Sequence, residues 1–141
     1  MTKHNIPFSV TGLDHVVLRA QDAPGLVAFY INCIGCKLVW ERPDLGLWHL
    51  GIGNAMLDIV SFAGPLGQSG VSAPAGLGRN VDHICVTIDK FDFDKISKHF
   101  ACFGIEIDYP KSRYGAKGYG DSIYIRDPEG NGVELKRDTF V

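Results

Sequence analysis

An internal repeat constrains the fold of this chain more than any other feature of its sequence. The first half contains the apolar run Leu13–Leu18, and the second half contains a similar run, Val81–Val86. Each run has the length of a β-strand and holds one Asp-His pair. Self-similarity of this kind indicates that one structural unit occurs twice, so the two halves are expected to have the same order of elements.

A second match lies near the end of each half. An offset of 76 residues pairs Asp58 with Glu134 and Trp48 with Tyr124. Two matched blocks in the same order make a chance resemblance between the halves improbable, and the second half has about eight extra residues.

Each half also carries one helix signal at the same place. Asp22 is a suitable N-cap before Pro24, and an apolar stripe follows it and stops at Gly35. In the second half an apolar stripe over 93–103 has the same spacing and stops at Gly104.

Three strand-like runs follow each helix signal. They are Cys36–Glu41, Gly46–Gly51 and Ala55–Phe62 in the first half, then Ile105–Tyr109, Asp121–Arg126 and Gly132–Lys136 in the second. The sequence therefore predicts an α+β fold, in which two βαβββ modules make one domain over 1–141. The modules cover about 10–62 and 80–137, and residues 63–79, rich in Gly, Pro and Ser, form the linker.

Composition excludes several classes of function. The 141 residues have a net charge of −2 and no basic run, which argues against nucleic-acid binding. No apolar run approaches the ~20 residues of a membrane helix, and the polar start does not resemble a signal peptide, so we expect a cytoplasmic protein. The four cysteines are expected to be reduced core thiols. Cys33-x-x-Cys36 lacks the second pair that a zinc site needs.

Strand alternation places four polar residues where a metal could bind. If the two modules pack with pseudo-twofold symmetry, His15, Asp58, His83 and Glu134 meet across a single cleft. Two imidazoles and two carboxylates suit one divalent ion such as zinc, nickel, manganese or iron. One strand His beside an Asp is usually a structural pair, but its recurrence with a matched carboxylate favours metal binding, with Asp58 the least certain ligand.

These residues resemble the vicinal oxygen chelate superfamily, which includes glyoxalases, epimerases, fosfomycin-resistance and bleomycin-resistance proteins and extradiol dioxygenases. The most specific matching segment is Tyr124–Leu135, with its Asp-Pro-Glu-Gly-Asn turn. The resemblance implies paired modules whose curved sheets form a metal-bearing cleft. His15 and His83 match the ligands of the family's first strands, and Glu134 matches its final carboxylate. Asp58 stands where glyoxalases carry Glu and epimerases Gln.

The resemblance implies a metal-dependent lyase or isomerase similar to lactoylglutathione lyase. Such an enzyme acts on a small oxygenated or thiol-adduct substrate by stabilising an enediolate, with Glu134 or Asp58 as the base. Three alternatives stay open: an extradiol-type dioxygenase using His15, His83 and Glu134, a fosfomycin-type thiol transferase, and a metal-free drug-binding protein. The dioxygenase is disfavoured because no further cleft histidine is evident.

Other residues are expected to contact the substrate. Arg19 lies on the strand face of His15, and glyoxalases use a similar Arg for glutathione. Tyr124 and Arg126 are predicted to face the cleft, and Trp48 occupies the position equivalent to Tyr124. His49 matches Ile125 at the same offset, so it is expected to face away from the cleft and to be structural.

The extra length of the second half is expected at 112–119, which predicts a flexible basic lid that brings Lys117 to an anionic substrate.

Assembly is the last expectation from the sequence. The linker is long enough for the modules to pair within one chain or between two chains, and both arrangements occur in related proteins. We therefore expect a homodimer, with the cleft either inside one chain or shared between subunits.

Overall fold

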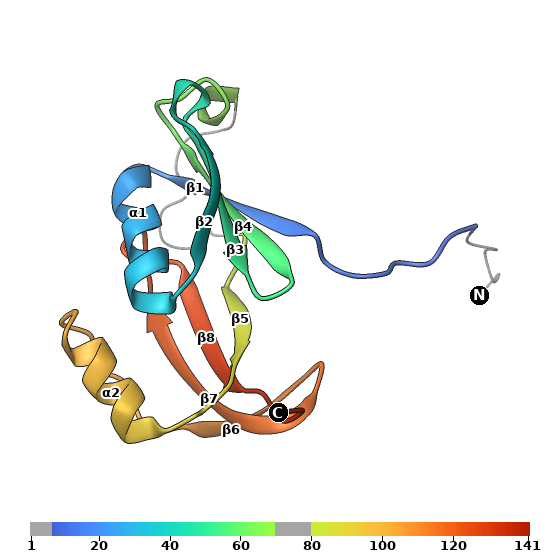
Figure 1. The fold of residues 1–141 in the computed structure, drawn as a ribbon, viewed down its shortest axis with the longest axis vertical. Coiled ribbons are helices and arrows are strands. Elements are labelled where there is room, and N and C mark those ends of the chain that lie inside the picture. The colour runs from blue at the N-terminus through green and yellow to red at the C-terminus, as the bar shows by residue number, and fades with distance from the viewer. Residues whose placement is uncertain (1–6, 70–79) are drawn as a thin grey trace.

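The computed structural model describes residues 7–69 and 80–141 and contains two four-stranded sheets, one from each half of the chain (Figure 1). The first half forms β1 (His15–Ala20), α1 (Ala23–Phe29), a π-helical turn η1 (Tyr30–Ile34), β2 (Lys37–Arg42), a 3₁₀ turn η2 (Pro43–Leu45), β3 (Leu47–Ile52), β4 (Ala55–Ser61) and a 3₁₀ turn η3 (Gly67–Ser69). The second half forms β5 (His83–Ile88), α2 (Phe93–Ala101), β6 (Lys111–Gly115), β7 (Gly118–Arg126) and β8 (Gly132–Arg137).

The two sheets have the same topology. Their strand orders are β1-β4-β3-β2 and β5-β8-β7-β6. In each sheet the first and last strands of the module pair in parallel, and the remaining pairs are antiparallel. The predicted α+β fold of two βαβββ modules is therefore confirmed. Residues 70–79, which make up most of the predicted linker, lie outside the described residues.

The helices begin and end where the sequence predicts. The carboxylate of Asp22 accepts a hydrogen bond from the Gly25 N–H at 3.1 Å, and Asp92 caps α2 in the same way. The first helical segment ends at Gly35, whose φ of 88° is in the left-handed region that glycine adopts without strain.

A single apolar core joins the two halves. The helix α1 contributes Leu26 and Phe29, and η1 contributes Tyr30, which are nearly or completely buried. These side chains belong to the same cluster as residues of both sheets: Leu50, Leu57, Ile59, Ile123, Ile125, Val133 and Leu135. Each sheet thus contributes one face to this core, and its second face remains outside it.

The carboxylate of Asp127 connects the modules through a buried hydrogen bond. The Tyr30 hydroxyl donates to Asp127 Oδ2 at 2.7 Å, and Asp127 is only 4% exposed. Asp127 also accepts hydrogen bonds from the backbone N–H groups of Glu129 and Asn131 and from the Asn131 side chain. The same carboxylate therefore shapes the turn between β7 and β8 and holds α1 against it.

The region before β7 differs from the prediction. Residues Ile105–Tyr109 do not form a strand; Ile105 and Ile107 pack on the core, and Tyr109 stacks on Phe93. The strand follows instead at Lys111–Gly115 and pairs with β7. The predicted lid over 112–119 is thus mostly β-hairpin, because Gly118, with a φ of 83°, allows a tight turn back into β7.

The tip of this hairpin is attached to the end of β8. Lys117 Nζ lies 2.7 Å from Asp138 Oδ2, and the Thr139 hydroxyl donates to the Lys117 carbonyl at 2.7 Å. Lys136, a buried lysine, donates to the Gly118 carbonyl at 2.8 Å. These contacts hold the tip in place.

Two expectations from composition can be compared with the structure. None of the four cysteines forms a disulfide, as expected, but only Cys33 and Cys36 are buried, and Cys85 and Cys102 are exposed. Among residues 7–69 and 80–141, no helix has the length and apolar character needed to cross a membrane.

We expect Tyr30→Phe to lower the free energy of unfolding by about 1–3 kcal/mol, because it removes a buried hydrogen bond to a charged acceptor. Chemical denaturation measures this change. Tyr109→Phe is the matched control, since Tyr109 is 80% exposed and should change stability by less than about 0.5 kcal/mol. Equal effects of the two substitutions would contradict the role assigned to the Tyr30–Asp127 bond.

The hairpin attachment should depend on pH. The hydrogen bond from Lys117, together with one from the Phe140 N–H, lowers the pKa of Asp138. A lowered carboxyl pKa adds stability above the ordinary value of about 3.9, and this stability is lost as the pH falls through the lowered pKa. Amide exchange in β6 should therefore be slower in wild type than in Asp138→Asn at neutral pH, and the difference should disappear in acid. A difference that persists in acid would contradict this explanation.

Candidate functional site

The two repeated histidines are held in the same way. His15 Nδ1 donates to Asp14 Oδ1 at 2.6 Å, and His83 Nδ1 donates to Asp82 Oδ2 at 2.7 Å. The hydrogen bond from His15 to Asp14 raises the pKa of the imidazole, and the Asp58 carboxylate adds to this effect. With Nδ1 occupied, Nε2 is the nitrogen left to bind a metal in each ring, which is how metal-binding histidines are commonly oriented. The sequence analysis identifies the repeated Asp-His pair but assigns no role to its aspartates.

In the second module, His83 and Glu134 lie next to each other at the start of β5 and in β8. His83 Nε2 is 3.5 Å from Glu134 Oε2, and the Tyr124 hydroxyl donates to Glu134 Oε1 at 2.7 Å. Strand register explains this grouping, because Glu134 is the direct partner of both Tyr124 and Cys85. We refer to His83, Tyr124 and Glu134 as the second half-site.

The surroundings of Glu134 favour its ionised form. Burial by itself would raise the pKa of this carboxyl, but the hydrogen bond from the Tyr124 hydroxyl, with the neighbouring Cys85 and His83 side chains, outweighs it, so the pKa lies below its usual range. Desolvation and the neighbouring Glu134 carboxylate raise the pKa of the Cys85 thiol to about 12. At neutral pH this face therefore offers a carboxylate and a protonated thiol.

In the first module, Asp58 is paired with a histidine that the sequence analysis places on the wrong face. His49 and Asp58 are direct partners in β3 and β4, and His49 Nδ1 lies 2.8 Å from Asp58 Oδ1. Asp58 is 6% exposed and shares its sheet face with His15, which lies on the neighbouring strand β1. We refer to His15, His49 and Asp58 as the first half-site.

The wrong assignment of His49 comes from a difference in turn length. The turn between β3 and β4 has two residues, Gly53 and Asn54, whereas three residues separate the paired Asp127 and Asn131. An offset of 76 residues therefore pairs the equivalent residues of β4 and β8 correctly. For β3 and β7 the correct offset is one residue smaller. His49 is the structural counterpart of Tyr124, so the prediction that it faces away is wrong.

The same error assigns Trp48 to the wrong face of its sheet. It pairs with Ile59 and packs against the apolar core, so it does not lie on the face that carries Asp58. Its predicted place in the cleft is therefore wrong. The turn lengths, which can be counted in the sequence, are the signal that would have placed both residues correctly.

Three other residues that are predicted to contact the substrate form hydrogen bonds or ion pairs with other groups of the chain. Arg19 donates to the Gly67 carbonyl at 3.0 Å and lies over the Phe62 ring. Arg126 donates to the Gly130 carbonyl at 3.0 Å. Lys117 is paired with Asp138, so it holds the hairpin tip instead of closing over a cleft.

The structure does not bring the four predicted ligands together. Within the described ranges, 7–69 and 80–141, no group of three or more His, Cys, Asp or Glu residues is arranged to hold a metal ion. The reason lies in the core: the neighbours of Asp58 and Glu134 along their strands, Leu57 and Val133 among them, are buried in one shared cluster. The two half-sites therefore lie on the outer faces of their sheets.

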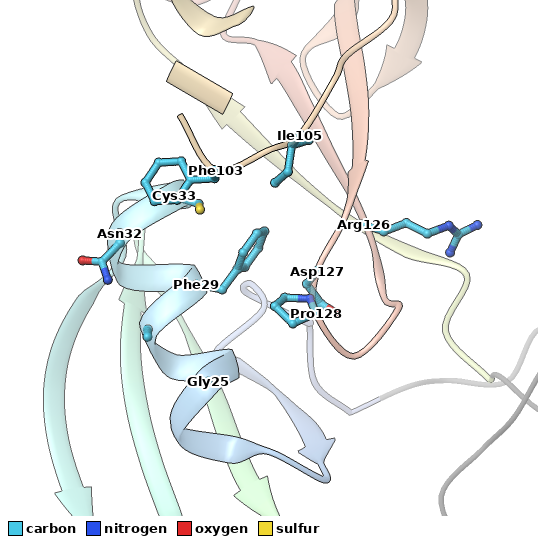
Figure 2. Close-up of a pocket in the computed structure, with 10 residues that line it drawn as sticks. Gly25, Phe29, Asn32, Cys33, Phe103, Ile105, Arg126, Asp127 and Pro128 are labelled. Atoms are coloured by element: carbon cyan, nitrogen blue, oxygen red, sulfur yellow. The ribbon is translucent and has the colours of Figure 1, made fainter. Parts of the chain in front are cut away.

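A cavity of about 420 Å³ lies on the opposite, helix-covered side, between α1 and the end of β7 (Figure 2). Phe29, Cys33, Phe103, Ile105 and Pro128 surround it, and the Arg126 side chain extends away from it. None of the predicted metal ligands lines this cavity.

The donors of the two half-sites fit a divalent metal, although one chain holds only part of a ligand set. His15 and His83 use Nδ1 for their aspartates, which leaves Nε2 as the nitrogen that could bind zinc, iron or manganese, and the lowered pKa of Glu134 favours the carboxylate form that binds these metals. Asp58 differs, since one of its oxygens is hydrogen-bonded to His49.

Comparison with known proteins agrees with the fold. Residues 12–135 match the model of the Glyoxalase/Bleomycin resistance protein/Dioxygenase superfamily. A biphenyl-2,3-diol 1,2-dioxygenase of Rhodococcus globerulus is 31% identical over 91% of this chain, and the match spans 64% of that relative.

Two solved structures share the architecture. A lactoylglutathione lyase from Agrobacterium tumefaciens is 26% identical, with a TM-score of 0.65 over 93% of this chain and 96% of its own. An integron cassette protein from V. cholerae is 25% identical, with a TM-score of 0.70 over 95% of this chain and 100% of its own. Taken with the repeated modules and the two Asp-His pairs, the family match shows that this chain belongs to the glyoxalase/bleomycin resistance protein/dioxygenase superfamily.

Proposed function

We propose that this chain is a metal-dependent lyase or isomerase that acts on a small oxygenated or thiol-adduct substrate. Its cleft is completed by a second copy of the chain, so that the first half-site of one subunit faces the second half-site of the other. The observation that carries the proposal is the 2.8 Å contact between His49 and the buried Asp58, beside His15.

Three residues would hold the metal. His15 and His83 would supply their Nε2 atoms, and Glu134, whose Oε2 lies 3.5 Å from His83 Nε2, would supply a carboxylate whose lowered pKa makes it a better ligand than base. A divalent ion held there would act as a Lewis acid on a substrate oxygen. The Tyr124 hydroxyl, 2.7 Å from Glu134, fixes the orientation of this carboxylate.

The His49–Asp58 pair supplies the group that moves a proton. Because Asp58 accepts from Nδ1, the Nε2 atom of His49 is free to take a proton from a carbon of the substrate and to return it. These roles differ from the sequence-based expectation, in which Glu134 or Asp58 is the base and Asp58 is also a metal ligand.

The need for a second chain follows from burial. In one chain the apolar face of each sheet contributes to the core, so the half-sites on the other faces lie outside it. Two chains that exchange modules would bring a first and a second half-site together twice, which makes a homodimer with two equivalent clefts.

An extradiol-type dioxygenase is the second candidate, and a specific observation supports it. The sequence analysis disfavours this class because it finds no further cleft histidine, yet His49 lies on the same face as Asp58. Non-haem iron oxygenases bind their metal through two histidines and one carboxylate, and the same residue types are present in His15, His83 and Glu134. Assays of the glutathione hemithioacetal of methylglyoxal and of catechol ring opening, each with Ni²⁺, Zn²⁺, Mn²⁺ or Fe²⁺, would separate the two classes.

The shared cleft predicts complementation between inactive chains. His15→Ala and Glu134→Ala homodimers should each bind little metal. In a mixed dimer one cleft combines the intact first module of the Glu134→Ala chain with the intact second module of the His15→Ala chain. Metal analysis of mixed dimers, separated by different affinity tags, should therefore show about one tightly bound ion per dimer. If purified mixed dimers bind no more metal than either parent, the clefts are not shared.

The proposed roles of His49 and Asp58 predict a separation of metal binding from turnover. Asp58→Asn and His49→Gln should keep most of the metal content, while turnover falls by about 10²–10⁴-fold, the usual contribution of a general acid-base group. Glu134→Gln should instead lose the metal. His99→Gln is the control, because His99 lies on α2 and contacts the Cys33 carbonyl. Loss of metal from Asp58→Asn as severe as that from Glu134→Gln would make Asp58 a ligand and contradict this assignment.

A further inference from the structure

The strand β2 contains an irregularity that changes the direction of a tryptophan. Leu38 pairs with Leu50, and the next pair along the ladder is Trp40 with His49, so Val39 is an extra residue in β2. Strict alternation from Leu38 would turn Trp40 toward the side of the buried Leu50. The bulge instead places Trp40 on the face of His49, and bulges next to functional sites often redirect a side chain in this way.

The redirected indole lies flat against the first half-site. Its ring stacks on the His49 imidazole, with centroids 5.4 Å apart and an interplanar angle of 7°. His49 is itself held by Asp58. The Arg42 guanidinium, in an ion pair with Asp44, lies 5.7 Å from the Trp40 ring. The indole is therefore positioned on the sheet by neighbours that are each held in place.

The outer surface of this indole is available. Trp40 is 56% exposed, and Val39 beside it is 60% exposed. The indole stacks on a histidine of the first half-site with one face, so its exposed face is open to a planar ring of a bound molecule. Offset stacking of a second aromatic ring on an indole is worth about two- to tenfold in affinity.

We propose that Trp40 is a specificity-determining residue, on which a planar aromatic group of the substrate stacks. Two strand spacings separate β2 from β4, so the stacked ring lies roughly 10 Å from the strand that carries Asp58. The ring is therefore distal to the reacting oxygens, and the substrate class is an oxygenated head group joined to an aryl group. The inference rests on the proposed function for the location of the head group, whereas ring binding at Trp40 can be tested without it.

The test uses phenol and cyclohexanol, which are similar in size and polarity but differ in planarity. The chain has two tryptophans, Trp40 and Trp48, so an NMR spectrum of the metal-free protein contains two indole N–H signals, assigned with Trp48→Phe. Phenol should shift the Trp40 signal saturably and at a concentration at least fivefold lower than cyclohexanol. The signal of Trp48, which packs on the core, should not move.

Two variants complete the experiment. Trp40→Ala should abolish the phenol-induced shift of the backbone amide of Gly51, which lies next to Val39, and Trp40→Phe should retain it. Both variants should bind metal as wild type does, so failure of the stacking proposal is distinguishable from failure of the proposed function. Equal responses to phenol and cyclohexanol, or an unchanged Gly51 shift in Trp40→Ala, would overturn the proposal.

Discussion

The burial of one face of each sheet in a common core determines the placement of every functional residue in this chain. Strand alternation allows only one face to be apolar, and here the apolar faces of both sheets and α1 contribute to the same cluster. The polar faces, which carry the buried carboxylates Asp58 and Glu134, consequently lie outside this core. In the site that we propose, a second copy of the chain supplies the complementary half-site.

The contacts that support the half-sites are mostly between neighbours in sequence or in strand register. Asp14 and Asp82 precede the histidines that they orient, and Tyr124 and Cys85 are the ladder partners of Glu134. Such contacts form together with the sheet itself. The half-sites are therefore arranged before any metal binds, which lowers the entropic cost of binding.

Sequence analysis accounts for most of the fold because each element is signalled locally. The N-caps Asp22 and Asp92 and the terminating glycines locate the helices, and the Asp-His repeat locates β1 and β5. The errors arise where one extra residue reverses the sheet face to which all the following side chains point. A three-residue turn in place of two misplaces His49 and Trp48. The bulge at Val39, which sets the face of Trp40, has no signal in the sequence pattern. Pairing between the modules depends on contacts between distant segments, such as Tyr30 with Asp127, which no local pattern reveals.

The protonated state of Cys85 has a consequence for the durability of the second half-site. Peroxides and other oxidants attack thiolates far faster than thiols, and the next steps to sulfinic and sulfonic acid are irreversible. Because the Glu134 carboxylate beside it and desolvation raise the pKa of Cys85 to about 12, almost none of this cysteine is thiolate at neutral pH. In the metal-free chain the Glu134 carboxylate thus also disfavours the reactive thiolate form of the cysteine beside it.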